Sequence, residues 1–573
     1  MASRSAVALL LSSVMIAGCG TAVAPGRDGR PAVPGLTHVE GLGSLSFPNS
    51  GNAAAQAPFV RGVLLLHSFE FDTAAEAFRE AQEADRDFAL AYWGEAMTYN
   101  HPLWQQQDRE AALAALGRLG PTPADRAREA GTDREAMYLQ AVETLYGEGA
   151  KADRDRAYMD AMGRLQDAFP DDMEARAFHA LAILGSRDGV RDFATYMRAA
   201  ATAQPVFDAN PDHPGAAHYL IHSFDDPIHA PLGLPAARKY AGIAPGAAHA
   251  QHMTSHIFVA MGLWDDVIAA NVRARDTQDA QALARGGRAN VCGHYSSWLQ
   301  YGYLMRGDVG DAAALMDRCH ARMAESPSAS ERTYFVAMRA RQILDTGDWS
   351  LADRWRWPSA EAEAAAEPET RLEYDFANAF AGLRRGDPSA ARALLAAPAP
   401  PGAPARLHLD ELRGLLALAG GRTDEGLRIL GAAADAEDAL PFEFGPPRIL
   451  KPTRELLRRG APRRGTPGRR RGRVPARARA HARPHARRAR PGCRGGRRRP
   501  ARARDSAGAV PQAPAARAPV PGAPDRRCAA RGRCRPPARS TARQPTAVRR
   551  DTSCASNGCV IPLVYMNCSG IWN

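Results

Sequence analysis

Histidine is the residue type that this sequence concentrates most sharply, and imidazole is both a proton carrier near neutral pH and a common metal ligand. The chain has 16 histidines in 573 residues, and three of them fall within the eight-residue segment His249–His256. Two more, His218 and His222, stand 34 residues before His252 and His256. This crowding and repetition favour a site over scattered surface residues.

The spacing of these histidines predicts that they share one face of each of two helices. Residues at i and i+4 project from the same side of an α-helix, so His218 pairs with His222 and His252 with His256. His249 joins the second pair, since the three rings of that segment span about 60° of the helix circumference. Neutral imidazoles at this spacing form a chelating pair for zinc, copper and similar ions.

The elements that must position these side chains are predicted to be helices in pairs. From about Pro58 to Leu457 the sequence consists of Ala-rich amphipathic segments of about 12 to 16 residues, separated by Gly, Pro or Asp. No segment shows the sustained alternation of a strand, so strands are not expected. Pro211 and Pro245, which precede the two histidine segments, are 34 residues apart. That period is typical of a tetratricopeptide (TPR) helix pair.

We therefore predict an all-α fold, an α-solenoid of irregular TPR-like helix-turn-helix repeats over residues 58–457. Phe258, Gly262 and Trp264 stand at the spacings of the TPR signature. Thr73–Asp85 supplies the Ala-x3-Phe-x2-Ala pattern of a second helix. In such a stack the histidine positions line the concave groove that the first helices form, and we expect them to be accessible there.

Several segments also resemble those of a group of bacterial TPR-repeat proteins with His-rich segments. They are "LLHSFEFDTAAEAFREA", "AYWGEAMTYNHPLW", "HPGAAHYLIHSFDDP", "APLGLPAARKYAGIAP" and "HAQHMTSHIFVAMGLWDD". The resemblance covers about residues 58–349 and is patchy beyond them. It implies a TPR fold and a role for these segments, and it implies no particular reaction.

Two functions of different classes fit the histidines. The first is a site for a divalent transition metal, with zinc or copper foremost, whose candidate ligands are His218, His222, His249, His252, His256 and His294. If such an ion activates a water for hydrolysis, Glu95 and Asp225 are weak candidates for the catalytic base, and whether the chain is an enzyme stays open. The alternative is a protein-interaction scaffold, in which the histidines donate hydrogen bonds to a protein or peptide ligand in the concave groove.

The N-terminus has the pattern of an export signal. Arg4 precedes the apolar run Ala6–Ile16, and Ile16-Ala17-Gly18-Cys19 resembles the lipobox of bacterial lipoproteins, in which the cysteine becomes lipid-modified. We expect residues 1–19 to be a signal peptide, 20–57 a tether, and the protein to be lipid-anchored at Cys19 in the cell envelope, facing the periplasm. Gly20 favours the outer membrane, because aspartate there marks inner-membrane retention. A plain secretory signal is the alternative. No other apolar run approaches the roughly 20 residues of a membrane span.

The positive net charge belongs to the C-terminal end. Residues 458–573 hold 30 of the 74 Lys and Arg residues and only 3 of the 62 acidic ones, a net charge of +27. The remaining 44 basic and 59 acidic residues give −15, so nucleic-acid binding is not expected of the folded part. The tail's Arg, Pro, Ala and Gly cannot bury a core, and we expect disorder. A frameshifted gene end is favoured over a functional basic arm.

Overall fold

The structure is a computed structural model of the 573-residue chain, and it describes residues 35–187 and 191–460. The predicted signal peptide with Cys19, and the basic tail beyond Gly460, lie outside the described residues. The described residues all belong to one compact unit.

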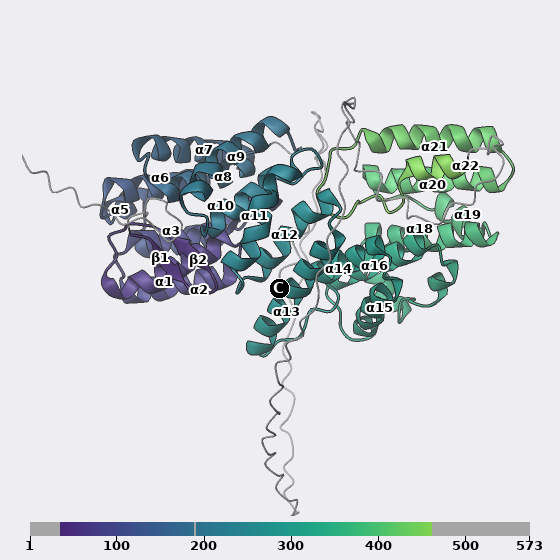
Figure 1. Cartoon of the computed structure of the whole chain (residues 1–573), viewed down its shortest axis with the longest axis horizontal. Coiled ribbons are helices and arrows are strands. Elements are labelled where there is room, and N and C mark those ends of the chain that lie inside the picture. The colour runs from purple at the N-terminus through teal and green to yellow at the C-terminus, as the bar shows by residue number, and fades with distance from the viewer. Residues whose placement is uncertain (1–34, 188–190, 461–573) are drawn as a thin grey trace, which may run out of the picture. The chain divides into compact units, whose positions relative to one another are not determined.

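Helices dominate the described residues, which form 22 α-helices (Figure 1). The first eleven are α1 (Ala53–His67), α2 (Phe71–Ala84), α3 (Ala89–Thr98), α4 (Arg109–Leu119), α5 (Pro123–Arg128), α6 (Asp133–Leu145), α7 (Lys151–Ala168), α8 (Met173–Gly185), α9 (Phe193–Ala209), α10 (Pro214–Phe224) and α11 (Ala230–Ile243). The others are α12 (Ala248–Met261), α13 (Trp264–Ala284), α14 (His294–Arg306), α15 (Val309–Met323), α16 (Ala329–Thr346), α17 (Ala360–Ala364), α18 (Pro368–Arg385), α19 (Ser389–Ala396), α20 (Ala403–Ala419), α21 (Thr423–Asp438) and α22 (Thr453–Gly460). Two short 3₁₀ helices, η1 (Pro102–Trp104) and η2 (Trp349–Asp353), complete the set.

Successive helices pack against one another, which confirms the predicted all-α helical-repeat fold. α10 packs on α11 and α12 on α13, and α10 also contacts α12, so the first helices of two successive pairs are neighbours (Figure 1). α10 and α12 begin 34 residues apart, as the sequence period predicts. The apolar stripes of the helices form consecutive core clusters, each shared by a few neighbouring helices. Such stacking is how repeat proteins bury a core.

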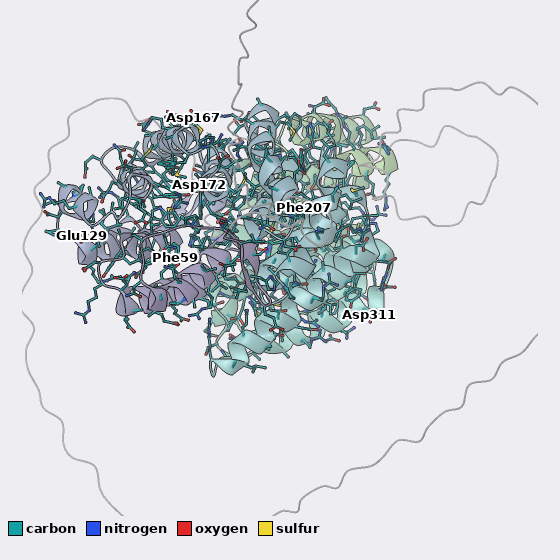
Figure 2. The ribbon with its side chains drawn as sticks, turned by 60° about the vertical axis from the view of Figure 1, so that its left-hand side comes forward. Phe59, Glu129, Asp167, Asp172, Phe207 and Asp311 are labelled. Atoms are coloured by element: carbon teal, nitrogen blue, oxygen red, sulfur yellow. A yellow bond between two sulfur atoms is a disulfide. The ribbon has the colours of Figure 1, made fainter. Side chains whose placement is uncertain are left out.

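Side-chain caps and glycines set the ends of several helices. Asn52 accepts hydrogen bonds from the backbone of Ala54 and Ala55 at the start of α1. Asp172, labelled in Figure 2, accepts from the backbone of Glu174 and Ala175 in the first turn of α8. Gly262, with a φ of +71°, ends α12 in the left-handed conformation that favours glycine. The helix that carries three of the histidines therefore stops where the sequence places its glycine.

The prediction that strands are absent is wrong at two places. β1 (Thr37–Val39) pairs antiparallel with β2 (Gly43–Leu45), and β3 (Asn100–His101) pairs with β4 (Gln106–Gln107). Strands of two or three residues are too short to show a two-residue period, which is why the pattern gives no sign of them.

The first hairpin also corrects the predicted tether at 20–57, because the ordered fold begins before residue 58. Leu45 is fully buried, and the ring of Phe47 packs against Phe59, with 5.3 Å between the ring centroids. Phe59 is itself fully buried in the N-terminal core (Figure 2). The backbone N–H of Ser44 donates to the carbonyl of Asp212 at 3.0 Å, so this segment is held by the chain just before α10.

Two remaining features concern cysteines and membranes. Cys292 and Cys319 form a disulfide that connects the loop before α14 to α15. Among the described residues, no helix combines the length and apolar character required to cross a lipid bilayer.

Candidate metal centre

Three helices bring the six predicted histidines together. α10 carries His218 and His222, α12 carries three more, and His294 is the first residue of α14. Pro214 occupies the first turn of α10, where its missing N–H costs no hydrogen bond, and His213 caps that helix by accepting from the backbone of Ala216. The i, i+4 spacing then places His218 and His222 side by side, with their Nε2 atoms 3.1 Å apart.

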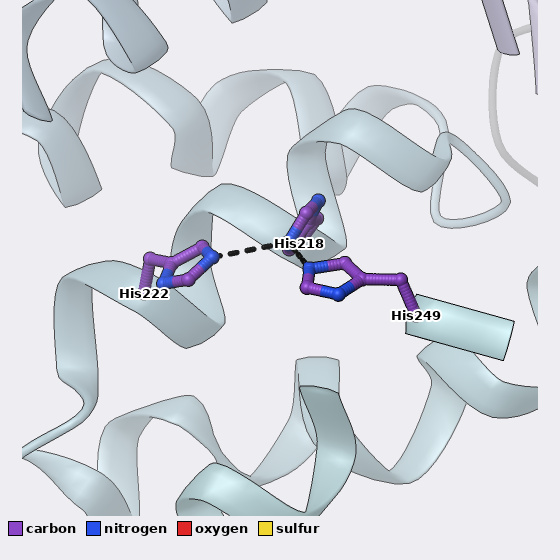
Figure 3. A group of neighbouring side chains, drawn as sticks. All are labelled: His218, His222 and His249. Atoms are coloured by element: carbon purple, nitrogen blue, oxygen red, sulfur yellow. Dashed lines mark hydrogen bonds between the residues drawn. The ribbon is translucent and has the colours of Figure 1, made fainter. Parts of the chain in front are cut away.

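The histidines form two groups of three, each arranged around a central ring. His218 Nε2 lies 3.1 Å from His222 Nε2 and 3.2 Å from His249 Nε2; we call these residues the first trio (Figure 3). In the second trio, the Nε2 atom of His252 lies 3.1 Å from that of His256 and 3.0 Å from that of His294. In the first trio all three ligand nitrogens lie within 4.8 Å of one another, and the second trio does not meet this limit. Nitrogen atoms bound to one tetrahedral zinc ion stand roughly 3.3 Å apart, given Zn–N bonds of about 2.0 Å.

The cluster is buried, and the expectation of an accessible groove is wrong. The five histidines of α10 and α12 are between 0 and 4 % exposed. Phe69, in the turn between α1 and α2, lies with its ring centroid 4.3 Å from that of His218. Trp298 of α14 covers His256 at 4.4 Å, and Phe444 approaches the same ring at 5.4 Å. These aromatic residues come from distant parts of the chain and fill the space that a solenoid would leave as a groove.

Hydrogen bonds fix which nitrogen carries the proton in the two central rings. His218 Nδ1 donates to the backbone carbonyl of His67 at 2.7 Å, and a carbonyl can only accept. His252 Nδ1 lies 2.8 Å from the side-chain oxygen of Asn271, whose amide nitrogen donates to the carbonyl of Val267. Both neutral rings therefore keep the proton on Nδ1 and direct the lone pair of Nε2 into the cluster.

The second trio is held in the same way at its other two members. His256 Nδ1 donates to the carboxylate of Asp225 at 2.7 Å, and His294 Nδ1 lies 3.0 Å from the hydroxyl of Tyr334. A backbone carbonyl, an amide oxygen or a carboxylate behind the ring is the arrangement that orients metal-binding histidines in proteins.

Burial keeps five of the six rings neutral at pH 7. It lowers the pKa of His218 and of His294 to about 3. Burial followed by repulsion from neighbouring imidazoles holds the pKa of His222, His249 and His252 well below the ordinary value of 6.5. Neutral imidazole is the form that binds a metal ion.

A second buried group, His67 with Glu174 and His213, has all its polar atoms matched by hydrogen bonds. His67 Nε2 and His213 Nε2 each donate to an oxygen of Glu174, at 2.8 and 2.9 Å. His67 Nδ1 lies 2.8 Å from the hydroxyl of Tyr219. Burial raises the pKa of Glu174, but the two histidines outweigh it and lower the pKa to about 2. This group is complete without an ion.

The two candidate catalytic bases occupy different surroundings. The carboxylate of Glu95 accepts from Arg79 at 2.9 Å and from Gln82 at 2.6 Å, and it forms an ion pair with Arg118. Its hydrogen bonds reach none of the six histidines. Asp225 belongs to the cluster, but its Oδ2 atom is held by the ring of His256.

Sequence reasoning missed the residues that support the cluster from outside the histidine segments. Asn271 lies on α13 and Tyr334 on α16. A single polar residue on a helix can serve many structural purposes, so neither residue could be recognised from the sequence. Phe69 has a φ of +56°, which is a strained backbone conformation for a residue with a bulky side chain. Strained backbone conformations of this kind are common at functional sites. Of these supporting residues, only Phe69 lies in a segment that the sequence analysis singled out. That segment, "LLHSFEFD", resembles a segment of the TPR-repeat proteins.

Comparison with known proteins adds little beyond the fold. No protein-family model matches the chain, and none of the curated proteins compared matches it. Among solved structures, the crystal structure of the P58(IPK) TPR domain is 13 % identical, covers 71 % of this chain and 97 % of that chain, and superposes with a TM-score of 0.19. With so low a TM-score, this structure supports no inference about the chain. The helix pairs and the 34-residue spacing of the chain itself make it a TPR-like helical-repeat protein.

Proposed function

We propose that this protein is a helical-repeat interaction scaffold whose histidine cluster binds a divalent transition metal ion as part of its folded core. The scaffold role rests on the stacked helix pairs, because such repeats expose long continuous surfaces that bind proteins and peptides. The metal role rests on the geometry of the cluster. Zinc and copper are the foremost candidates, since imidazole suits both ions.

The contact between His252 and His256 carries the metal proposal. Each ring donates its Nδ1 proton to an outside acceptor, Asn271 or Asp225. When both rings are neutral, their Nε2 atoms face each other at 3.1 Å with a lone pair on each side. Such a contact is repulsive unless a cation lies between the two atoms. A metal ion supplies that charge without protonating a buried ring.

The surroundings of the cluster favour binding over hydrolysis. Glu95 is committed to Arg79, Gln82 and Arg118, and Asp225 is committed to His256, so neither candidate base is free to take a proton from a metal-bound water. Their hydrogen bonds give each carboxylate a structural role. We therefore propose no reaction.

A partner peptide would bind away from the histidines. Rings that are at most 4 % exposed cannot hydrogen-bond with a ligand on the surface. The peptide-carboxylate role that the sequence suggested for them is thus not part of this proposal. In our proposal the metal ion stabilises the repeats, and the protein partner contacts the outer surface that they present.

The test compares the purified full chain with the variant His252→Ala/His256→Ala. We expect the unaltered chain to hold zinc or copper stoichiometrically at pH 7.5 and to lose several degrees of melting temperature on chelation, because an ion bound only by the folded state stabilises it. The variant should hold less metal and respond less to chelation. His179→Ala serves as the matched control, since His179 is 8 % exposed and bonds Gln166 outside the cluster. No metal in the unaltered chain, with no shift on adding either ion, would leave only the scaffold.

A further inference from the structure

The loop between α21 and α22, residues 439–452, touches the histidine cluster, and we call it the strap. The ring of Phe444, near its middle, has its centroid 5.4 Å from that of His256. Gly445 follows, and a β-carbon there would lie 2.4 Å from the ring of Trp298. Trp298 in turn packs on His256, with 4.4 Å between the ring centroids. The strap therefore covers His256 twice, directly through Phe444 and indirectly through Trp298.

The C-terminal end of the strap is anchored in the core. Ile449 and Leu450 are only 4 % and 1 % exposed. Just beyond the strap, the backbone N–H of Thr453 donates to the carboxylate of Glu437 on α21 at 2.7 Å. The Thr453 hydroxyl donates to the carboxylate of Glu411 on α20 at 2.8 Å. These buried contacts hold the end of the strap in place on two helices.

The middle of the strap is less firmly packed. Phe442 and Phe444 are each 37 % exposed, although both side chains are large and apolar. Arg341 of α16 donates to the backbone carbonyl of Pro447, so this part rests on the helices through a polar contact as well. Local opening costs least where the least apolar surface is buried. The middle of the strap can therefore lift while its C-terminal end stays attached.

A metal ion needs a path into the cluster, and the helices that carry the histidines do not offer one cheaply. Tyr219 of α10, Ile257 of α12 and Leu299 of α14 are fully buried, so displacing any of these helices would break the core. The edge of the cluster at His294 is only half-buried. The ring of His294 also contacts Trp298, at 5.7 Å between centroids. Lifting the strap from Trp298 would thus widen an edge that is already partly open.

We propose that the strap is the gate through which a metal ion enters and leaves the histidine cluster, opening at residues 442–447. This inference rests on the proposed metal-binding function and adds how exchange of the ion is controlled. Because the ion passes the same opening in both directions, a gate sets the rates of uptake and release together. It leaves the affinity almost unchanged, whereas loss of a residue that binds the ion would lower the affinity.

The test measures zinc exchange on the full chain. Release from the zinc-loaded protein is followed after mixing with EDTA, uptake by the metal-free protein is followed by stopped flow, and affinity is measured by chelator competition. We expect Phe444→Ala to speed both uptake and release by about tenfold or more, because the ring that closes the strap over His256 is gone. Its affinity should stay within about twofold of the unaltered chain.

Phe442→Ala is the matched control. It removes the same side chain from the same loop at the same 37 % exposure, and in the described structure Phe442 has no ring contact with a histidine. Its exchange rates should stay close to those of the unaltered chain. A second variant replaces residues 442–447 by Gly and Ser, and it should exchange zinc at least as fast as Phe444→Ala.

The possible failures are distinguishable. No bound zinc in the unaltered chain overturns the proposed metal function, and this inference falls with it. Bound zinc whose exchange rates are the same in the unaltered chain, in Phe444→Ala and in the Gly/Ser variant overturns only the gate. Faster release with unchanged uptake, and hence weaker affinity, would make Phe444 part of the binding contact and would also overturn the gate.

Discussion

At the scale of single residues, the cluster depends on acceptors that lie behind the imidazole rings. The acceptor for His252 is Asn271, which fixes the proton on Nδ1 and turns Nε2 toward its neighbours. The histidines were predictable from the sequence because their spacing repeats. Asn271 and Tyr334 were not, since a single Asn or Tyr on another helix has no pattern of its own.

Replacing Asn271 by Leu tests this support. The leucine leaves His252 without its acceptor, so the ring loses its fixed tautomer and orientation. We expect zinc affinity, measured by competition with a chromogenic chelator, to fall by about 10- to 100-fold. The control is Asn210→Leu, which removes a buried amide that bonds Ser44 and should lower stability without changing affinity. Equal affinity in Asn271→Leu and the unaltered chain would count against the role of Asn271.

The buried rings also predict how stability depends on pH in the metal-free chain. Burial lowers the pKa of His218 and of His294 to about 3, whereas in the unfolded chain both have the ordinary value near 6.5. Between these values the unfolded chain binds more protons, so stability falls as pH falls. Each such ring should remove roughly 2 kcal/mol from the free energy of unfolding between pH 7 and pH 5. Urea unfolding at several pH values measures this, and a flat profile would show that the rings are not buried.

At the scale of elements, the helix pairs were predictable and the covering of the cluster was not. A 34-residue period and the Gly and Pro positions located α10 and α12 well, because these signals are local. Phe69, Trp298 and Phe444 come from three separate parts of the chain, and their approach depends on how the repeats stack. The hairpin β1–β2 escaped prediction for a related reason, since Leu45 and Phe47 are buried only by contacts with distant helices.

The loop between α21 and α22 supplies part of that cover, and Gly445 allows its close approach. Its φ is +84°, and a β-carbon there would lie 2.4 Å from the ring of Trp298. Gly445→Ala should therefore strain the backbone and push the loop away from Trp298. We expect the free energy of unfolding to fall by roughly 1–3 kcal/mol. Gly386→Ala is the matched control, because its φ is +89° and no atom would meet the new carbon within 4 Å. Equal losses in the two variants would mean that the loop does not pack on Trp298.

At the scale of the whole molecule, the ordered part is a TPR-like stack that encloses a histidine cluster. The export signal, lipid modification at Cys19 and location in the cell envelope stay predictions, as does disorder of the tail, because these segments lie outside the described residues. The net charge of −15 before residue 458 continues to argue against a nucleic-acid partner for this part. The scaffold role and the metal site both stay proposals for this stack of helices.

X-ray absorption at the zinc edge of the zinc-loaded full chain tests the central claim most directly, because it reads the ligands of the bound ion. We expect a first shell of nitrogen at about 2.0 Å, with the outer-shell scattering of three imidazoles per zinc. That signal should disappear in the variant His218→Gln/His252→Gln. A first shell of sulfur, or of oxygen without imidazole scattering, would contradict the claim that the histidine cluster binds the metal.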